Sequence, residues 1–360
     1  MLFRSRGHRV GVVTARFPGT VRHEVISGVE VHRVWAVPRP GTFSATFLPS
    51  LGLFLLLRGS RYQIWHAHQA FYNAAVAVTV GRLRGARSVV KDASSGPYGD
   101  VARSTRIPGG RWIRGSLRRA DAVISLNDEM TSELDSIGVE ARRIRRIPNG
   151  VDCSVFTPIS QMQRAAARSS LGISDAENVA LYAGRLSEDS GADVLIDAWR
   201  LLETQSQERP WRSLVAGADV AGSSYRSRGE RELRRATFVG HVKDVQPLLS
   251  AADVLVRPSR TEGMSNVVLE AMASGLPIVA SDTGGLKEQV EHEVTGIRVS
   301  PGKPADLAGG MQRLLGDPVM RLRMGAAGRR RVEARYAVDL VVSSYENLYA
   351  QIVSETSTPI

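Results

Sequence analysis

Apolar and polar positions along the chain follow two alternating patterns. Short apolar runs, or runs in which apolar and polar residues alternate, predict strands, whereas longer stretches with apolar residues on one face predict helices. In the first part of the chain, strands are expected at 9–15, 29–35, 63–67, 88–92 and 121–126, and helices at 44–57 (after Pro49), 71–82 and 128–137. Asn127 or Asp128 is expected to cap the last of these helices.

The same alternation returns in the second part, after a turn predicted at Ile147-Pro-Asn-Gly-Val-Asp152. Strands that alternate with helices indicate a parallel, doubly wound α/β sheet. At 360 residues the chain is long enough for two such domains. Strands are expected at 178–183, 213–216, 237–239, 253–257, 277–280 and 296–299, and helices at 192–203, 244–251, 265–274, 285–292, 304–315, 318–334 and 338–353.

Charge is unevenly distributed between the two parts. Residues 1–150 hold 23 Lys and Arg against 10 Asp and Glu, a net charge of +13, and the rest of the chain has a net charge of −2. The basic part therefore suggests an anionic partner: a membrane surface, a phosphorylated acceptor or nucleic acid. A general preference of the genome for Arg would explain the basic charge equally well. No basic motif interleaved with aromatic residues favours nucleic acid, so we expect none to bind.

Membrane and disulfide signals are weak. The longest apolar run, Phe47 to Leu57, is predicted to be too short to span a bilayer, and no apolar signal core follows Met1. We expect a cytoplasmic protein, with peripheral attachment at the inner membrane face as the alternative. A single cysteine, Cys153, argues against a disulfide framework.

The stretch from Arg257 to Pro277 carries the clearest chemistry. Its predicted helix is apolar almost all round, yet it contains Glu270, and Glu262 stands just before the first turn. Buried carboxylates are costly unless they pair or accept hydrogen bonds. The junction Gly263-Met264-Ser265-Asn266 would present unpaired N–H groups, which suit phosphate. Carboxylates for hydroxyls and a helix end for phosphate can together hold a sugar nucleotide.

This stretch, with two Glu separated by seven residues within Pro-Ser-Arg-x-Glu-Gly…Leu-Glu-Ala-Met-Ala-x-Gly-x-Pro, resembles the signature of family 4 glycosyltransferases. The resemblance implies a retaining enzyme of the GT-B fold, with two Rossmann-like doubly wound domains facing across a cleft. It implies an acceptor-side domain at 1–150, a domain binding the nucleotide sugar at 151–335, and a helix at 336–360 that crosses back to the first domain.

The resemblance also implies roles for individual residues. Glu262 would contact the donor sugar, Glu270 the ribose hydroxyls, and Arg185 the diphosphate, with Glu262 and Arg185 as the catalytic pair. In the segment Gly-Arg-Leu-x-x-x-Lys-Gly of the family, Ser190 replaces the Lys, which removes a cation from the leaving group. The alternative is that Glu270 pairs with a buried Arg and Glu262 is a solvated loop residue. The expected donor-binding residues are Gly184, Arg185, Ser190, Glu262, Gly263, Met264, Ser265, Asn266 and Glu270.

Weaker candidates lie at four other places. The glycines of Ser281–Gly285 would let a ligand approach the backbone, and Phe238–Val242 resembles the family segment that meets the nucleobase. Lys91–Gly96 follows a strand at the edge where ligands bind. His66 and His68 are more simply explained as packed histidines than as catalysts.

The beginning of the sequence is unusual for this family. Residues 2–8 resemble only the end of the first helix, so we expect the first strand and its glycine-rich loop to be absent, through a truncated chain or a misassigned start.

We expect neither a metal nor a cofactor, since the sequence has no Asp-x-Asp and no Cys/His cluster with metal-binding spacing. The expected function is transfer of a hexosyl group from a nucleotide diphosphate sugar to an acceptor hydroxyl with retention, in cell-surface glycan or glycolipid synthesis. The acceptor would be a glycan, a lipid-linked molecule or a small molecule. Alternatives are a degenerate homologue that binds a nucleotide sugar or a partner without turnover, and a nucleotide-sugar epimerase on the same frame.

Overall fold

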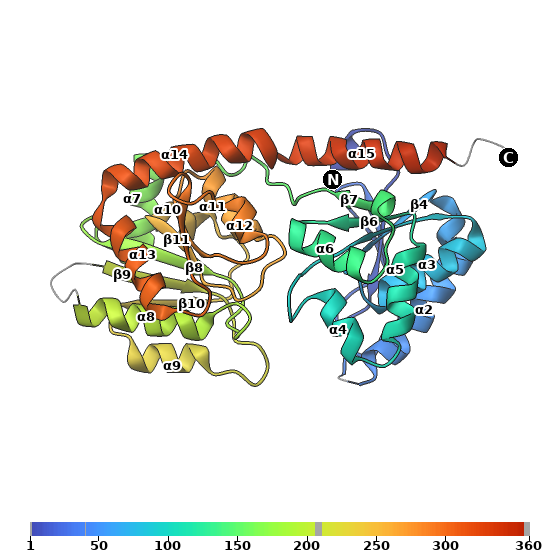
Figure 1. Ribbon diagram of the computed structural model, residues 1–360, viewed down its shortest axis with the longest axis horizontal. Coiled ribbons are helices and arrows are strands. Elements are labelled where there is room, and N and C mark those ends of the chain that lie inside the picture. Colours follow the sequence, from blue (N-terminus) through green and yellow to red (C-terminus); the bar gives the residue numbers. More distant parts are fainter. Residues whose placement is uncertain (1, 40, 206–210, 356–360) are drawn as a thin grey trace. The chain divides into compact units, whose positions relative to one another are not determined.

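The computed structural model describes residues 2–39, 41–205 and 211–355 (Figure 1). The chain divides into two compact units. Unit 1 comprises Met1–Pro148 together with Val341–Ile360, and unit 2 comprises Asn149–Leu340. Each unit contains a parallel sheet flanked by helices, which confirms the predicted α/β class.

Unit 2 is built on a parallel sheet whose six strands, among the residues described, run in the order β10-β9-β8-β11-β12-β13. The order reverses next to β8, since β9 and β10 lie on one side of it and the later strands on the other. Such a reversal is where doubly wound sheets bind ligands. The strands are β8 (Asn178–Ala183), β9 (Trp211–Ala216), β10 (Ala236–Gly240), β11 (Val254–Arg257), β12 (Ile278–Ser281) and β13 (Gly296–Val299).

Helices cover both faces of this sheet. On one face, Trp199 of α8 and Met311 of α13 pack in an apolar core with Val256 and Val279 of the strands. On the other face, α7 packs against α10, and α11 against α14. The helices are α7 (Gln161–Ser170), α8 (Ala192–Gln205), α9 (Tyr225–Glu232), α10 (Gln246–Ala251), α11 (Asn266–Ala273), α12 (Leu286–Gln289), α13 (Pro304–Gly316) and α14 (Pro318–Arg335).

Unit 1 contains two sheets in its described part. One is the parallel sheet β4-β5-β6-β7, and the other has the order β1-β3-β2, in which β1 pairs parallel and β2 antiparallel with β3. Within these sheets β1 and β4 each pair on one side only. The strands are β1 (Gly11–Ala15), β2 (His23–Ile26), β3 (Val29–Val34), β4 (Ile64–His68), β5 (Arg87–Lys91), β6 (Ala122–Ser125) and β7 (Ile144–Arg146). The expected loss of a first strand stays a prediction.

The last helix of the chain, α15 (Val338–Ser354), packs on unit 1. Its buried side chains Val341, Tyr345 and Leu348 join a core with Val89 and Ile124 of the sheet. The other helices of unit 1 are α1 (Leu2–Ser5), α2 (Phe43–Arg58), α3 (Tyr72–Arg84), α4 (Asp100–Arg106), α5 (Gly110–Arg119) and α6 (Asp128–Ser136), with short 3-10 turns η1 (Gly59–Arg61) and η2 (Ala141–Arg143).

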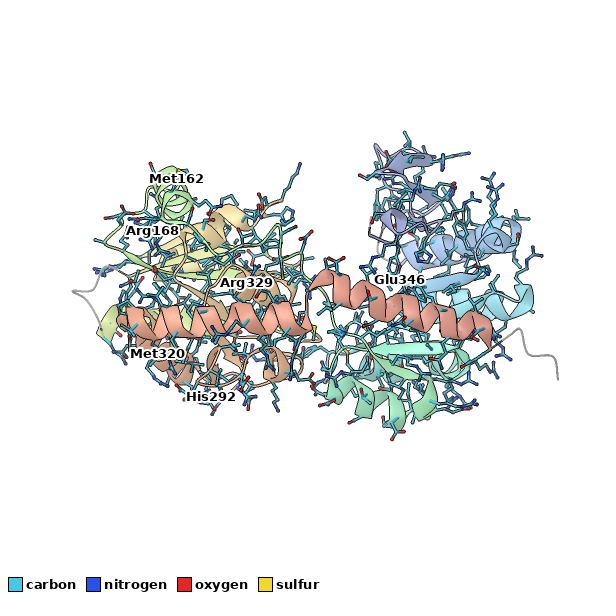
Figure 2. The ribbon with its side chains drawn as sticks, turned by 90° about the horizontal axis from the view of Figure 1, so that it is seen from above. Met162, Arg168, His292, Met320, Arg329 and Glu346 are labelled. Carbon is cyan, nitrogen blue, oxygen red and sulfur yellow. The ribbon has the colours of Figure 1, made fainter. Side chains whose placement is uncertain are left out.

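Charged side chains fasten each of the last two helices within its own unit; Figure 2 labels Arg329 on α14 and Glu346 on α15. In unit 2, Arg329 of α14 donates hydrogen bonds to the carbonyl oxygens of Phe156 and Ala273, at 2.6 and 2.7 Å. In unit 1, Glu346 of α15 accepts from Arg6 at 2.7 Å and lies 3.0 Å from the ring of His8.

Two predicted helices differ from the observed ones. The helix α2 begins at Phe43, before Pro49 rather than after it, because Phe43 stacks on Phe17 and on Phe47 and supports a first turn upstream of the proline. The helix α12 ends at Gln289 rather than at 292, since the chain turns there to pair as β13.

The prediction that the apolar run at 47–57 is too short for a bilayer was wrong in one respect. With the turn that follows it, α2 forms a helical stretch from Phe43 to Arg61, 19 residues with a mean hydropathy of 1.3, which is long and apolar enough to cross a membrane by length and composition. Only 17% of its apolar 18-residue window is buried within the protein.

Candidate active site

A pocket of about 500 Å³ opens in unit 2 at the carboxyl ends of β8, β9 and β10. Its volume is in the range of sites for small organic ligands. The lining includes three of the predicted donor-binding residues, Gly184, Arg185 and Glu270. Gly184 and Arg185 follow β8, and Glu270 reaches the pocket from α11. The pocket thus lies at the reversal of strand order, where the fold class predicts a ligand.

Two glycines form a closely packed wall of this pocket. A Cβ atom on Gly217 would lie 1.7 Å from the carbonyl oxygen of Gly184, and a Cβ atom on Gly184 would lie 2.2 Å from Nη1 of Arg257. Neither position can hold a side chain without displacing backbone or a buried guanidinium. The loops after β8 and β9 are therefore held in contact, and the ligand meets backbone there.

Glu262 is fixed by a buried arginine. Its Oε2 atom accepts from Nε and Nη2 of Arg257 at 2.8 and 2.6 Å, and from Oγ of Ser259 at 3.2 Å. The side chains of Arg257 and Glu262 are 12% and 16% exposed. All these bonds go to Oε2, so Oε1 accepts none from the described residues. One oxygen is anchored, and the other is available to a ligand.

Glu270, unlike Glu262, is not held by another side chain among the described residues. It lies half-buried at the pocket, and in the part of the chain that the structure describes its carboxylate has no hydrogen bond or ion pair. Burial raises the pKa of the Glu270 carboxyl above its usual value, and the charge of Asp244 adds to this effect. A half-buried carboxylate without a partner is typical of a group whose partner is a ligand.

The alternative reading of the two carboxylates, in which Glu270 pairs with a buried Arg and Glu262 is solvated, is therefore not what the geometry shows. A buried Arg is present, but it holds Glu262.

Arg185 is mobile enough to serve a ligand. Its side chain is 71% exposed, and its ion pair with Asp189 is long, at 3.4 Å. An exposed pair of this kind contributes little to stability, so the guanidinium can turn toward an anion at small cost.

Ser190 lies outside the pocket lining. It is 4% exposed, and its hydroxyl accepts a hydrogen bond from Ser187 at 3.0 Å. The replacement of the family's Lys by Ser thus places a small buried group in the wall behind the loop.

The helix junction offers fewer free amides than the sequence suggested. The N–H of Ser265 donates to Oε1 of Gln289 at 2.9 Å, and Gln289 donates back to the carbonyl of Ser265 at 2.8 Å. Gln289 is fully buried, so this amide is satisfied inside the protein rather than by phosphate. The expectation that the Ser265 amide is unpaired was wrong, because a side chain 24 residues away supplies its acceptor.

The other junction residues are tied to the start of unit 2. Asn149 donates from Nδ2 to Oδ1 of Asn266 at 2.9 Å and to the carbonyl of Met264 at 3.3 Å. Gly263 and Met264 are buried. Gly263, Met264, Ser265 and Asn266, like Glu262, lie outside the pocket lining and form the support beneath the first turn of α11.

The Ser281–Gly285 loop packs against the backbone of Glu262 and Gly263. A Cβ atom on Gly284 would lie 2.1 Å from the carbonyl oxygen of Glu262, and one on Gly285 would lie 1.9 Å from that of Gly263. The N–H of Gly285 donates to the Glu262 carbonyl at 2.9 Å. The glycines predicted to meet a ligand therefore meet the backbone that carries Glu262.

The pocket is also lined by residues outside the motif around Glu262 and Glu270. His241 and Val242, within the predicted nucleobase segment, line it. Residues 217–220 also line it and were not predicted. Their signal was their position directly after a strand, at the carboxyl edge of the sheet.

In unit 1, the two strand-end histidines are packed. The rings of His66 and His68 stack with centroids 4.6 Å apart, and Nδ1 of His66 lies 2.6 Å from the hydroxyl of Tyr349 on α15. Burial lowers the pKa of His66 to about 3, with further effects from His68 and Lys91. A histidine that stays neutral beneath a helix is a structural group.

The loop after β5 is held by acidic side chains. The N–H of Gly96 donates to Glu133 at 2.6 Å, and Asp100 accepts from the amides of Ala70 and Ala93 at 3.0 and 3.3 Å. Burial, and then the charges of Asp100 and Glu133, raise the pKa of Asp92 well above its usual range.

Comparisons with known proteins agree with this fold. Residues 2–150 match the family described as glycosyl transferase 4-like domain, and residues 177–317 match glycosyl transferases group 1. Sucrose-phosphate synthase from Thermosynechococcus elongatus has a similar structure, with a TM-score of 0.82 and 25% identity over 98% of this chain and 91% of that one. HepE from Anabaena, solved in complex with UDP-glucose, shares the fold, with a TM-score of 0.76 and 21% identity over 89% of this chain and 86% of its own. The architecture is that of the GT-B enzymes.

The relatives found by sequence show which family of GT-B enzymes the chain belongs to. The D-inositol 3-phosphate glycosyltransferase of Jonesia denitrificans is 32% identical over 349 residues, 89% of this chain and 80% of that protein. The chain belongs to family 4 of the glycosyltransferases.

The Glu262–Arg257 pair predicts a large stability effect. We expect Glu262→Gln to lower the free energy of unfolding by about 3 kcal/mol, because it leaves the buried Arg257 guanidinium without its counter-charge. Urea unfolding measures this. The control is Glu230→Gln, since Glu230 and Arg226 are 48% and 46% exposed in their pair and an exposed pair contributes at most about 1 kcal/mol. Equal losses in the two variants would contradict the interpretation.

Glu270→Gln, unlike Glu262→Gln, should not lower the stability of the protein at pH 7. Because the folded-state pKa of Glu270 is raised, the folded protein binds its proton more tightly than the unfolded chain does, and stability falls as pH rises from the unfolded value, near 4.3, through the folded one. We expect the variant to be as stable as the wild type or more so at pH 7, and the difference to vanish near pH 4. Thermal unfolding at both pH values tests this, and a variant less stable at pH 7 would show that the carboxylate has a stabilising partner.

Proposed function

We propose that this enzyme transfers a hexosyl group from a nucleotide diphosphate sugar to an acceptor hydroxyl, with retention of anomeric configuration. The observation that carries the proposal is the pocket of unit 2, where Glu270 has no partner among the described residues and an exposed Arg185 stands at the carboxyl end of β8. An acceptor of hydroxyl hydrogen bonds and a donor to phosphate are the two groups that a nucleoside diphosphate requires.

The nucleoside is assigned to the part of the pocket between Glu270 and the β10 loop. The ionised Glu270 carboxylate would accept hydrogen bonds from the two ribose hydroxyls, which replace the water that burial removes. His241 and Val242 line the same pocket, and their backbone is the proposed contact for the base.

The diphosphate is assigned to Arg185 and the amino end of α11. The planar guanidinium can make paired hydrogen bonds to phosphate oxygens and neutralise charge as the diphosphate leaves. The dipole of α11 favours the same charge. We propose that no metal ion acts at the diphosphate.

Glu262 would position the sugar. Its Oε2 atom is held by Arg257, and the open Oε1 would accept from a sugar hydroxyl. An anchored carboxylate loses little freedom on binding, so more of the hydrogen-bond energy is available for alignment of the sugar. Retention and the hexosyl group follow from the resemblance of the two-Glu motif to that of the retaining family.

The acceptor is proposed to be anionic or lipid-linked. Residues 1–150 carry a net charge of +13. The relative from Jonesia denitrificans is named for action on D-inositol 3-phosphate, so a small phosphorylated polyol is one candidate. A lipid-linked acceptor for a surface glycan or glycolipid is the other.

The second candidate function is donor binding without turnover. It is favoured by Ser190, which stands where the family places a Lys, so one cation near the leaving group is missing.

The decisive experiment titrates the protein with UDP-glucose, UDP-N-acetylglucosamine and GDP-mannose by calorimetry. It then adds D-inositol 3-phosphate as acceptor and measures release of nucleotide diphosphate and the anomer of the glycosylated product by NMR. We expect one donor to bind and to turn over. Glu270→Gln should raise the donor Kd by roughly 10- to 100-fold, the loss expected for hydrogen bonds to a charged group. No binding of any donor would contradict the proposal.

The same assay separates the two candidate functions. Arg185→Ala should lower kcat/KM by roughly 10² to 10³, as for loss of one charged donor to a developing anion, whereas Ser190→Lys should not raise it, because Ser190 is buried. Donor binding without product in the wild type, with turnover gained in Ser190→Lys, would establish the non-catalytic alternative.

We also propose a cytoplasmic location with peripheral attachment of unit 1 to an anionic membrane. The helix α2 exposes Leu53, Leu56 and Leu57, which lie on one face at helical spacing, and the exposed Arg58 and Arg61 follow them. Apolar side chains beside cations are the arrangement that binds an anionic bilayer surface.

Vesicle sedimentation tests this attachment. We expect binding to phosphatidylglycerol vesicles but not to phosphatidylcholine vesicles at low salt, and a loss of at least tenfold in Leu53→Ser/Leu57→Ser, since each leucine contributes on the order of 1 kcal/mol or more of apolar burial. Leu322→Ser on α14 is the control, because Leu322 is 76% exposed in unit 2. If Leu53→Ser/Leu57→Ser binds the vesicles as well as Leu322→Ser does, the proposal is contradicted.

A further inference from the structure

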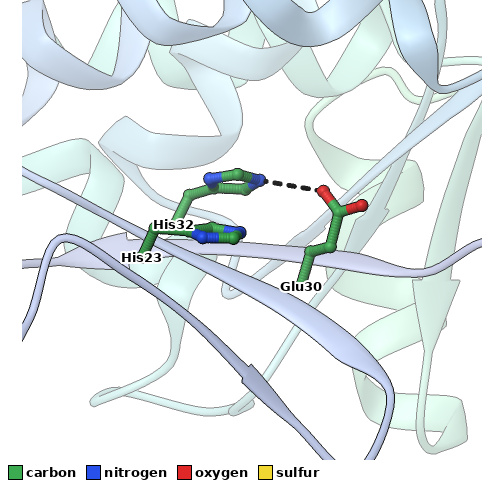
Figure 3. A group of neighbouring side chains, drawn as sticks. All are labelled: His23, Glu30 and His32. Carbon is green, nitrogen blue, oxygen red and sulfur yellow. Dashed lines mark hydrogen bonds and ion pairs between the residues drawn. The ribbon is translucent and has the colours of Figure 1, made fainter.

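Three side chains with metal-ligating atoms gather on the hairpin formed by β2 and β3, in unit 1. One ring nitrogen of His23, one of His32 and a carboxylate oxygen of Glu30 all lie within 4.8 Å of one another (Figure 3). None of them lines the pocket of unit 2. Neither the fold nor the proposed transfer reaction requires this combination of residues at this place.

The turn of the hairpin explains why the three residues meet. Ser27 and Gly28, with φ of 49° and 80°, form a two-residue connection with left-handed conformation at both positions, which is typical of tight hairpins and fixes their register. His23 is thereby placed opposite His32. Glu30 lies two residues before His32 on the same strand, so both point to the same face.

The pairing also brings the two imidazoles as close as strands allow. The N–H of Arg33 donates to the carbonyl of Arg22 at 2.8 Å. In an antiparallel ladder the next pair, His23 and His32, is then a non-hydrogen-bonded pair, in which facing side chains are closest. Their rings stack with centroids 4.6 Å apart and planes inclined by 29°.

The ligand atoms converge at the edge of the stack. Nε2 of His32 lies 3.3 Å from Oε2 of Glu30, and in Figure 3 the ring edges of both histidines face this carboxylate. The side chain of His32 is 12% exposed and packs against Phe54 of α2 at 5.0 Å between ring centroids, whereas His23 is exposed. The group therefore has a packed side that orients it and an open side through which an ion can enter.

We propose that His23, Glu30 and His32 form a binding site for one divalent transition-metal ion. Two neutral imidazoles and a carboxylate are the donor set of three-ligand zinc sites, which leave a fourth position to water. The ion would bridge β2 and β3 and fasten the hairpin in its register. Binding of this ion is independent of the donor pocket and of the transfer reaction.

Arg9 supplies a competing charge. Its Nη2 atom lies 3.1 Å from Oε1 of Glu30, and its side chain is 58% exposed. A cation at this position opposes a second cation electrostatically, but an exposed Arg can turn into solvent. The site should therefore bind more tightly when Arg9 is removed, an effect that a purely structural ion pair would not produce.

The experiment uses the full chain without a histidine tag, stripped with a chelator and titrated with Co²⁺ as a spectroscopic probe and then with Zn²⁺ in competition. We expect one ion per chain with the visible absorption of a low-symmetry nitrogen and oxygen site. His23→Ala should weaken Zn²⁺ binding by at least tenfold, as should Glu30→Gln. Arg9→Ala should strengthen it severalfold.

The matched control is His292→Ala. His292 lies on the surface with Glu293 at 3.7 Å, so it offers one imidazole and one carboxylate without a second imidazole. Its loss should leave the stoichiometric site unchanged. Because His23 is exposed, His23→Ala is expected to fold normally, and near-native thermal unfolding of the metal-free variant checks this. The proposal is overturned by the absence of a one-to-one site, by equal affinity in wild type and His23→Ala, or by weaker binding in Arg9→Ala.

Discussion

The ion pair of Arg257 with Glu262 is the interaction on which the loops around the pocket of unit 2 depend. Arg257 ends β11, donates to the carbonyl of Ala183 at the end of β8, and lies directly beneath Gly184. One guanidinium thus joins two strand ends at the reversal of strand order to the loop before α11. Removing two charges from water is costly, and the two short bonds to Oε2 are the geometry that offsets this cost. Gly284 and Gly285 of the loop after β12 pack closely against the backbone of Glu262 and Gly263.

The parallel sheet and the motif residues could be predicted from sequence because their signals are local. Buried parallel strands are continuous apolar runs, and the two-Glu motif lies within one turn and helix. Partners could not be predicted in this way. Which carboxylate receives the buried Arg, and whether the Ser265 amide is free, depends on Gln289 and Arg257, which reach these groups only after the sheet has formed.

The β2–β3 hairpin shows a second limit of prediction from the sequence. The strand β2 has four residues, three of them exposed, so it carries no clear alternation of apolar and polar positions. Without β2 there is no register, and His23 and His32 are merely two histidines nine positions apart. The one local clue was Ser27-Gly28, a turn dipeptide directly before an alternating strand. Short antiparallel additions to a parallel fold are thus where sequence patterns are least informative about which side chains come together.

The contact between Gly184 and Gly217 has a consequence for how such an enzyme can diversify. Since neither glycine accommodates a Cβ atom, substitution there would displace the loops after β8 and β9, so this part of the pocket offers a ligand backbone atoms only. Val220, Val242 and Val245 line the same pocket with side chains rather than backbone. Changes in the shape of the pocket are therefore accommodated more easily at such side-chain positions than at the two glycines.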